Sequence, residues 1–399
     1  MQNIKILSKV CLLIAVYYLV YYLYNAFLHP LPMDGDSWDY HIPIALSMLN
    51  DSFLHATFST IPHLANPVTG RIHFLPQWYY PGSSEAINAL FIFLHIPAFS
   101  NIFATLVLFF CLWKLGRTFR LSYYYALLFA LTFCTLTVVL RWLNAVSIDI
   151  WMGVWFSLSV ILLERPQKSL LYFAKLGFVL GMLIGSKYTA LYFLFILLVF
   201  YGKQLFAASN LVRIITLLVP FSVCGLFWYI RNYLLIGNPF YPVPRFGFNG
   251  PLAFSDTVWD ETLKHPVAMF NAGFSEYHLW LFSVIIACAV LMYSFIIKKQ
   301  VYLTPLRKVF LLGVINFICY FSFPASSQSW IMVSSFRYSF PAFIPLLLGM
   351  FMLGAVYKKE MLLGYIAVAN MIPVLTMAYY PKLLFFSLPV GLLLVYVLD

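Results

Sequence analysis

The sequence predicts an all-α polytopic membrane protein, and three observations lead to this fold class. The mean hydropathy is +0.89, and 63% of the 399 residues are hydrophobic. Only 9% of the residues are charged. Long apolar runs alternate with short polar connections, and because lipid offers no hydrogen bonds, such runs satisfy their backbone as helices. The runs also lack the alternation of membrane-barrel strands. We expect about 11–13 transmembrane helices, at about 20 residues for each crossing.

The expected crossings follow the apolar runs in chain order. They lie at residues 6–28, 100–116, 122–141, 148–163, 170–186, 187–202, 211–230, 279–297, 309–324, 339–356, 361–379 and 383–398. The first run is longer than the apolar core of a signal peptide, and no small-residue cleavage pattern follows it. It is therefore expected to be an uncleaved anchor.

Basic residues gather in the connections on one side of the predicted membrane, and acidic residues gather on the other. Lys5, Arg307 and Lys358 represent the first group, and Asp36 and Asp256 represent the second. Because Lys and Arg in short loops determine orientation, the N-terminus is expected in the cytoplasm. The formal net charge of +11 is then a topological signal, so nucleic acid is not expected as a partner.

Two long segments fall on the outer side of this arrangement, residues 29–99 and 233–278. Within the first, apolar residues repeat at helical spacing from Ile42 to Leu49, which suits a helix lying in the membrane interface. The stretch Ser83 to Ile96 is apolar but spans only about 14 residues, too few for a comfortable crossing. Both pieces are expected to be juxtamembrane helices. Long ordered loops are usually functional, so both outer segments are candidates for function.

Three carboxylates, Asp34, Asp36 and Asp39, follow the first crossing within six residues. Carboxylates beside a bilayer are costly unless they meet water, a metal or a substrate. Asp34 and Asp39 also fit a bland role, which is to solvate the mouth of the loop.

Further polar motifs recur on the same outer side. They are the stretch Tyr79–Glu85, the acid Asp149, the string Gly185–Tyr188, the pair Arg231–Asn232 and the pair Arg337–Tyr338. A carboxylate there can remove a proton from an acceptor hydroxyl. Lysine and arginine can neutralise charge that develops on a phosphate leaving group. A second carboxylate can hold a divalent metal or orient the acceptor.

In their order along residues 1–340, these motifs resemble those of the GT-C glycosyltransferases. The similarity is to the branch that holds the protein O-mannosyltransferases and the bacterial lipid A aminoarabinose transferase. It implies a GT-C fold with a transmembrane catalytic module at residues 1–232, including the outer loop 29–99. Residues 233–399 would then supply the second outer loop and the C-terminal helices.

The resemblance also implies an activity. A sugar would move, with inversion, from a polyprenyl-phosphate donor to an extracytoplasmic acceptor, which is a glycan, a lipid or a protein. The setting would be a bacterial cytoplasmic membrane, with the active site on its extracytoplasmic face. Two rival functions stay open: an O-antigen ligase or polymerase, which usually carries its large loop late in the chain, and a transporter or flippase. A transporter predicts charged or broken helices at mid-bilayer, and Lys175 is the one clear charge inside an expected crossing.

By position, the resemblance assigns roles to nine residues. Asp36, Asp34 and Asp149 would be catalytic, Lys187, Arg337 and Arg231 would bind the donor phosphate, and Tyr40, His41 and Glu85 would bind substrate. Whether Asp34 or Asp36 is the base stays open, because the two are not adjacent as in many family members. A divalent cation, Mg²⁺ or Mn²⁺, would be held by Asp36 and Asp149 if the reaction uses one.

Several of these residues have structural alternatives. Asp149 equally fits a helix N-cap, because acidic residues favour helix N-termini. His41 fits a packed histidine, Lys187 fits a lysine that snorkels to the interface, and Arg231 fits an interfacial anchor.

Overall fold

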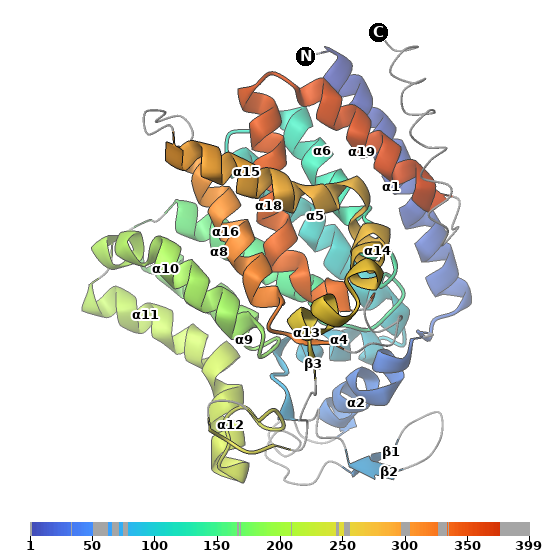
Figure 1. Cartoon of the computed structure of the whole chain (residues 1–399). Helices are drawn as coiled ribbons and strands as arrows, with labels where there is room; N and C mark the ends of the chain where they lie inside the picture. The colour runs from blue at the N-terminus through green and yellow to red at the C-terminus, as the bar shows by residue number, and fades with distance from the viewer. Residues whose placement is uncertain are drawn as a thin grey trace. The chain divides into compact units, whose positions relative to one another are not determined.

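The computed structural model describes residues 2–32, 34–50, 63–65, 72–74, 79–165, 167, 169–208, 210–244, 247–250, 256–296, 304–325, 333 and 335–375. Within these residues the elements are almost all helices, and Figure 1 shows them in chain order. The described strands form only two short antiparallel pairs, β1 (His63–Ala65) with β2 (Ile72–Phe74) and β3 (Asp256–Thr257) with β4 (Pro324–Ala325).

Five helical runs are long and apolar enough to cross a membrane. They are Asn3–Leu28, Pro97–Thr118, Leu211–Ile236, Pro266–Ser294 and Phe336–Val356. Shorter apolar helices accompany them at Ser83–Phe93, Tyr123–Cys134, Leu170–Ile184, Ala190–Phe206 and Glu360–Ile372. The chain is therefore an all-α membrane protein, as its composition predicts. The predicted crossing 383–398 and the end of 361–379 lie outside the described residues.

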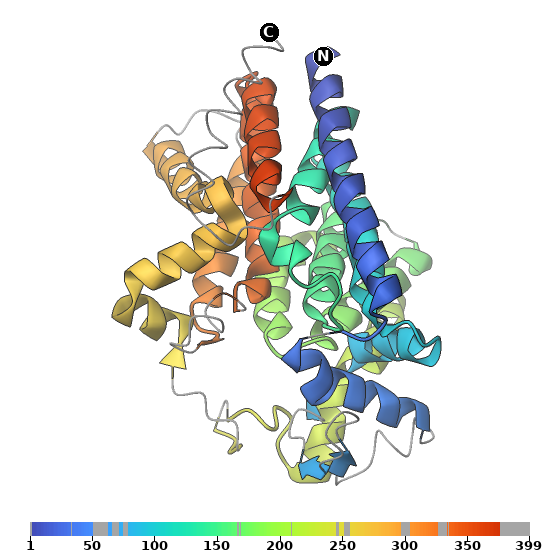
Figure 2. The ribbon, with the colours of Figure 1, turned by 90° about the vertical axis from the view of Figure 1, so that its right-hand side faces the viewer.

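The chain forms two compact units that interleave along the sequence. Unit 1 comprises Met1–Tyr21, Val107–Arg141 and Asp256–Asp399, and unit 2 comprises Tyr22–Leu106 and Trp142–Ser255. The long helices α1 (Gln2–Leu28), which Figure 2 shows along its length, and α5 (Ser100–Thr118) belong partly to each. The division at residue 232 predicted from the sequence concerns functional modules and stays a prediction.

Unit 2 carries the segment 29–99 and the helices between Trp142 and Ser255. Apart from its parts of α1 and α5, its helices are η1 (Ser37–His41), α2 (Ile42–Asn50), α4 (Ser83–Phe93), η3 (Pro97–Phe99), α8 (Asp149–Glu164), α9 (Leu170–Ile184), α10 (Ala190–Ala208), α11 (Leu211–Phe221), η4 (Ser222–Leu226) and α12 (Phe227–Ile236). The two helices predicted in this segment are present as α2 and α4, and their place at the membrane surface stays a prediction. The helical run that begins at Leu211 continues to Ile236, beyond the crossing predicted for 211–230. It ends at Gly237, whose φ of 76° is readily adopted by glycine.

A row of glycines on α9 lets two helices approach closely. A Cβ atom on Gly177 would overlap the backbone carbonyl of Leu217 on α11, and one on Gly181 would lie 3.0 Å from the Phe221 backbone. A Cβ on Gly185 would overlap the carbonyl of Cys224 in η4. Small residues at four-residue spacing allow this kind of backbone contact between membrane helices. They place the end of α9 directly against the end of α11 and against η4, the turn that leads into α12.

Unit 1 carries the remaining helices. They are α6 (Tyr123–Cys134), α7 (Thr137–Leu140), α13 (Val258–Lys264), α14 (Pro266–Tyr277), η5 (His278–Phe282), α15 (Ser283–Ile296), α16 (Thr304–Tyr320), η7 (Phe336–Ser339), α18 (Phe340–Val356) and α19 (Glu360–Leu375). Two sequence expectations are corrected here. The crossing predicted at 122–141 breaks after Cys134, where the Thr135 hydroxyl bonds back to the Leu131 carbonyl. The crossing predicted at 279–297 belongs to a longer helical run, Pro266–Ser294, which begins within the predicted loop 233–278; that loop contains α13 and α14.

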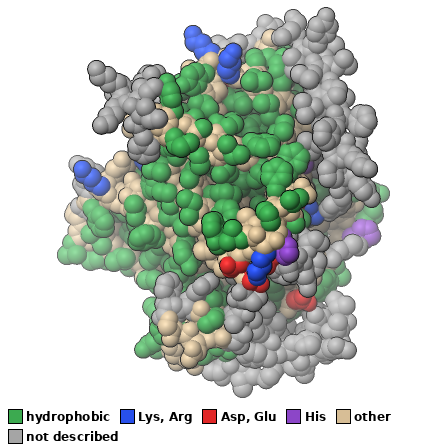
Figure 3. Space-filling view, in the orientation of Figure 1, with side chains coloured by type: hydrophobic (Ala, Val, Ile, Leu, Met, Phe, Trp, Pro, Cys, Tyr) green, Lys and Arg blue, Asp and Glu red, His purple; other side chains and the backbone are tan. Residues whose placement is uncertain are grey.

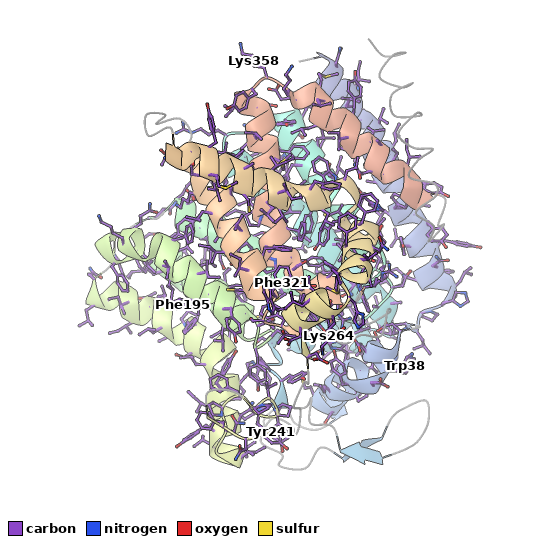
Figure 4. The ribbon with its side chains drawn as sticks, in the orientation of Figure 1. Trp38, Phe195, Tyr241, Lys264, Phe321 and Lys358 are labelled. Carbon is purple, nitrogen blue, oxygen red and sulfur yellow. The ribbon has the colours of Figure 1, made fainter. Side chains whose placement is uncertain are left out.

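The two ends of unit 1 differ in charge. Arg307 and Lys308 begin α16, whereas α13 binds the backbone just past the end of α16, at Phe321 and Phe323. In Figure 4 Lys358 marks one end of this unit, and Lys264 and Phe321 lie toward the other. Figure 3 shows acidic, basic and histidine side chains gathered around α13. Both signs of charge occur at the α13 end, where Lys264 pairs with Asp256, and the orientation of the chain in the membrane stays a prediction.

A capping box begins α13. The Thr257 side chain accepts from the Asp260 backbone, and the Asp260 carboxylate accepts from the Thr257 backbone and hydroxyl at 2.8 and 2.7 Å. These two bonds hold the pKa of the Asp260 carboxyl below its ordinary value, the hydroxyl having the larger effect. The helix start is therefore fixed by local bonds.

Candidate functional site

The first turn of α4 connects three parts of unit 2 through three consecutive side chains. The Ser83 hydroxyl accepts from the Trp228 indole at 2.7 Å and donates to the Cys224 carbonyl. The Ser84 hydroxyl lies 2.6 Å from the Ser186 hydroxyl. The Ser83 backbone N–H also donates to the Gly185 carbonyl at 2.8 Å. Two motifs that lie a hundred residues apart in the sequence, Tyr79–Glu85 and Gly185–Tyr188, therefore pack directly together.

Glu85, the third of these residues, pairs with His41. Its Oε1 bonds His41 Nδ1, and the two side chains are 5% and 1% exposed. Its Oε2 accepts from Asn88 Nδ2 at 3.0 Å, and the Ser100 hydroxyl donates to Asn88 Oδ1 at 2.6 Å. Glu85 lies in the first turn of α4, where the helix dipole favours a negative charge. The carboxylate is thus held on both oxygens by buried partners.

The acidic cluster leads into η1, a π-helical turn that continues into α2. Asp34 accepts from the Ser37 backbone N–H at 2.8 Å and from the Ser37 hydroxyl at 2.5 Å. Asp36 directly precedes the π-turn and is half-buried, whereas Asp39 is exposed. The Ser37 hydroxyl also accepts from the Val146 backbone at 2.7 Å. Both oxygens of Asp34 therefore hold the start of the turn.

Asp149 begins α8 and pairs with Lys187, which lies between α9 and α10. The distance from Lys187 Nζ to Asp149 Oδ1 is 2.8 Å. The structure records no side-chain cap at the residue before Asp149, Ile148. Asp149 thus stands in the first turn of its helix, where the dipole favours it, and it also neutralises the lysine.

These contacts form a closed circuit. It begins at Ser37, which bonds Val146, three residues before Asp149, and Asp149 pairs with Lys187. Ser186, the neighbour of Lys187, bonds Ser84. Glu85, the neighbour of Ser84, pairs with His41, which returns the circuit to the far end of η1. Four motifs separated in sequence are thereby linked around the turn that follows Asp36. Tyr40 lies in this turn and contacts the Tyr80 ring edge-on, at a centroid distance of 6.4 Å.

Arg231, on α12, is 1% exposed. Its Nε and Nη2 donate to Asn232 Oδ1 at 3.0 and 2.8 Å, and its guanidinium lies 4.9 Å from the centre of the Trp228 ring. Asn232 Nδ2 in turn donates to the Tyr79 carbonyl at 2.6 Å and to the Tyr188 hydroxyl at 2.8 Å. Arg231 is therefore buried and held by hydrogen bonds, whereas the alternative role considered from the sequence was an interfacial anchor.

Arg337 belongs to unit 1. It lies in η7, just before α18, and is 3% exposed. Its guanidinium stands 5.2 Å from the Tyr338 ring centre, and Nη2 donates to the Tyr338 hydroxyl at 3.3 Å. The other eight residues to which the sequence assigns a role all lie in unit 2.

The described residues include no group of three or more His, Cys, Asp or Glu side chains placed to hold a metal ion. Asp149, one of the two ligands expected for a divalent cation, is engaged with Lys187. Use of Mg²⁺ or Mn²⁺ stays a prediction.

Asn232, Tyr79 and Trp228 join the site although sequence reasoning gave them no role. Asn232 is fully buried and bonds four groups around Arg231. A polar amide beside an arginine at the end of an apolar run was the available signal, because such groups are retained in lipid only when bonded. Tyr241, labelled in Figure 4 near α12, contributes the carbonyl that accepts from the Tyr188 hydroxyl at 2.6 Å.

Comparison of the chain with models of protein families, with curated proteins and with solved structures gives no match.

Proposed function

We propose that this membrane protein is a GT-C glycosyltransferase that uses a polyprenyl-phosphate-linked sugar as donor. The acceptor lies on the extracytoplasmic side of a bacterial cytoplasmic membrane and is a glycan, a lipid or a protein. This proposal rests on the motifs of the sequence, and one structural observation supports it.

That observation is the closed circuit of contacts around η1. Motifs that the resemblance reads as one site lie far apart in the sequence, and a merely accidental similarity gives no reason for them to meet. In unit 2 four of them are joined by side-chain bonds from Ser37 to Val146, Asp149 to Lys187, Ser186 to Ser84 and Glu85 to His41. Asp36 directly precedes the π-turn whose first and last residues, Ser37 and His41, belong to this circuit.

In this mechanism Asp36 is the general base. Its carboxylate takes the proton of an acceptor hydroxyl, and the oxygen attacks the anomeric carbon of the sugar from the face opposite the phosphate. The new C–O bond forms as the bond from the anomeric carbon to the phosphate oxygen breaks, so the configuration inverts. The electron pair leaves with the polyprenyl phosphate, and we assign its charge to Lys187 and Arg231 of unit 2. The role of Arg337, which belongs to unit 1, stays a prediction from the sequence.

Asp34 has a different role in this proposal. Because both of its oxygens accept hydrogen bonds from Ser37, we assign Asp34 to ordering the turn. Asp149 keeps Lys187 in place until donor phosphate competes for the ammonium group.

A transfer assay in membrane vesicles tests the proposal. The probes are radiolabelled pentose and hexose donors on polyprenyl phosphate, added to native membranes that contain acceptors, with and without the protein. We expect the native chain to give labelled product and free polyprenyl phosphate. In Asp36→Asn the rate of transfer should fall by a factor on the order of 10³ or more. Asp39→Asn is the matched control, because Asp39 is an exposed carboxylate three residues away.

Equal transfer by Asp36→Asn and the native chain would refute Asp36 as the base. Movement of the donor across the bilayer with its sugar bond intact would instead favour a transporter or flippase.

A further inference from the structure

The π-turn η1 stands between Asp36 and α2 and determines how the two are oriented. Its defining bond runs from the Ile42 N–H to the Ser37 carbonyl, five residues back. Gly35 and Asp36 continue the helix before the turn, and α2 continues it afterwards. In an α-helix each residue advances by about 100° around the axis. A π-turn holds one residue more than an α-turn, so its loss rotates Asp36 by about 100° relative to α2.

Isolated π-turns in helices are uncommon and occur frequently at functional sites. This one is bonded at both ends. At its start, Ser37 is held by Asp34 and by Val146. At its end, His41 is held by Glu85.

The end of the turn is fixed by a chain of buried side chains that reaches across two helices. It runs from His41 to Glu85 and Asn88 on α4 and then to Ser100, the first residue of α5. All four residues are at most 4% exposed. Hydrogen bonds to a buried carboxylate are among the stronger ones in proteins. Apolar packing of α2 against α4, through Ala45 and Ala89, places the two partners side by side.

We propose that Glu85 is a positioning residue that holds the π-turn through His41 and so sets the direction in which Asp36 presents its carboxylate. Glu85 acts without touching the substrate, a role that differs from the substrate contact predicted from the sequence. The catalytic part of this inference rests on the proposed function. The positioning part concerns the fold of η1 alone.

Amide hydrogen exchange tests the positioning part without any substrate. The variants are Glu85→Ala, which removes both bonds, and Glu85→Gln, which keeps an acceptor for His41. We expect amide exchange in residues 35–42 to become about tenfold faster in Glu85→Ala, with an intermediate rate in Glu85→Gln. Exchange in α8 should stay as in the native chain.

Glu164→Ala is the matched control. Glu164 accepts a hydrogen bond from the Tyr201 hydroxyl at 2.7 Å and lies at the other end of α8 from Asp149. Its loss should leave residues 35–42 unchanged. If Glu85→Ala does not fold, Asn88→Ala removes the support on Oε2 alone, and a smaller increase in the same residues is expected.

Unchanged exchange in residues 35–42 in both Glu85→Gln and Asn88→Ala would overturn the proposal, as would an increase spread evenly over unit 2. The kinetic readout is separate: Glu85→Ala should lower kcat about 10- to 100-fold with a donor KM within about twofold, and Glu85→Gln should recover part of kcat. A raised KM with unchanged kcat would overturn the catalytic part, because it would mean substrate contact. Absence of transfer in the native chain would remove the proposed function while leaving the exchange result decisive.

Discussion

Lys187 and Asp149, which lie 38 residues apart in the sequence, pair at 2.8 Å with side chains 19% and 2% exposed. The pair joins the start of α8 to the connection between α9 and α10. It is unequal, because the lysine reaches solvent and the carboxylate does not. Replacing one partner therefore has a different cost from replacing the other.

Lys187→Ala should destabilise the protein more than Asp149→Asn. The alanine variant leaves a buried carboxylate without its cation. We expect this to lower the free energy of unfolding by about 3 kcal/mol, because Lys187 itself is partly exposed. The asparagine variant leaves a lysine that can turn toward water, so we expect a loss of about 1 kcal/mol or less. Unfolding in mixed detergent micelles measures both free energies. The double variant Lys187→Met, Asp149→Leu should be more stable than Lys187→Ala, and equal losses in the two single variants would show that the pair is solvated.

The transmembrane class follows from the sequence, because apolar length reports directly on the bilayer, whereas the outer position of the polar motifs stays a prediction from the Lys/Arg asymmetry. The pairing within the site does not follow from the sequence. Asp149 fits a helix cap and Lys187 fits a snorkelling lysine, and nothing local indicates that each is the other's partner. The π-turn at Ser37–His41 could not be predicted either. Apolar periodicity over so few residues does not distinguish backbone hydrogen bonds to the fourth preceding residue from bonds to the fifth. The break after Cys134 falls within an apolar run that gives no local stop signal, although the Thr135 hydroxyl bonds the Leu131 carbonyl there.

The glycine row of α9 gives a prediction about the fold. Gly177→Ala should lower the free energy of unfolding of unit 2 by at least about 1–3 kcal/mol, the usual cost of overpacking. The added Cβ would meet the Leu217 backbone, which cannot move aside as a side chain can by changing rotamer. Gly202→Ala on α10 is the matched control: its Cβ would meet only the Phe206 ring, at 3.8 Å. Since alanine favours helix over glycine by about 1 kcal/mol, the control should be neutral or stabilising.

Unfolding in mixed micelles again measures the difference. Two variants of equal stability would mean that α9 and α11 do not pack backbone to backbone. Gly185→Ala extends the test to the site, since its Cβ would meet both the Cys224 carbonyl and the Ser83 hydroxyl. We expect it to be destabilising, and where it still folds, to disturb the contact between the Ser84 and Ser186 hydroxyls.

Asn232 accepts hydrogen bonds from Arg231 through a neutral oxygen. Variants at Asn232 can therefore test separately its effect on the free energy of unfolding and its effect on the charge near Arg231. Asn232→Ala removes the acceptor of two guanidinium N–H groups and the donor to the Tyr79 carbonyl, so the free energy of unfolding should fall by about 2–4 kcal/mol. Asn210→Ala is the control. Asn210 caps the exposed start of α11, and its loss should cost about 1 kcal/mol.

Asn232→Asp keeps the acceptor for Arg231 and adds a negative charge, but it loses the donor to the Tyr79 carbonyl, so it should also be destabilised. If Arg231 helps to bind the donor phosphate, the aspartate competes with that phosphate, and the donor KM of the folded protein should rise about tenfold or more. Binding of a polyprenyl-phosphate sugar, followed by the change in tryptophan fluorescence near Trp228, measures this directly. Unchanged donor affinity in Asn232→Asp, together with the expected instability of Asn232→Ala, would restrict Arg231 to a structural role and leave Lys187 as the phosphate-binding residue of unit 2.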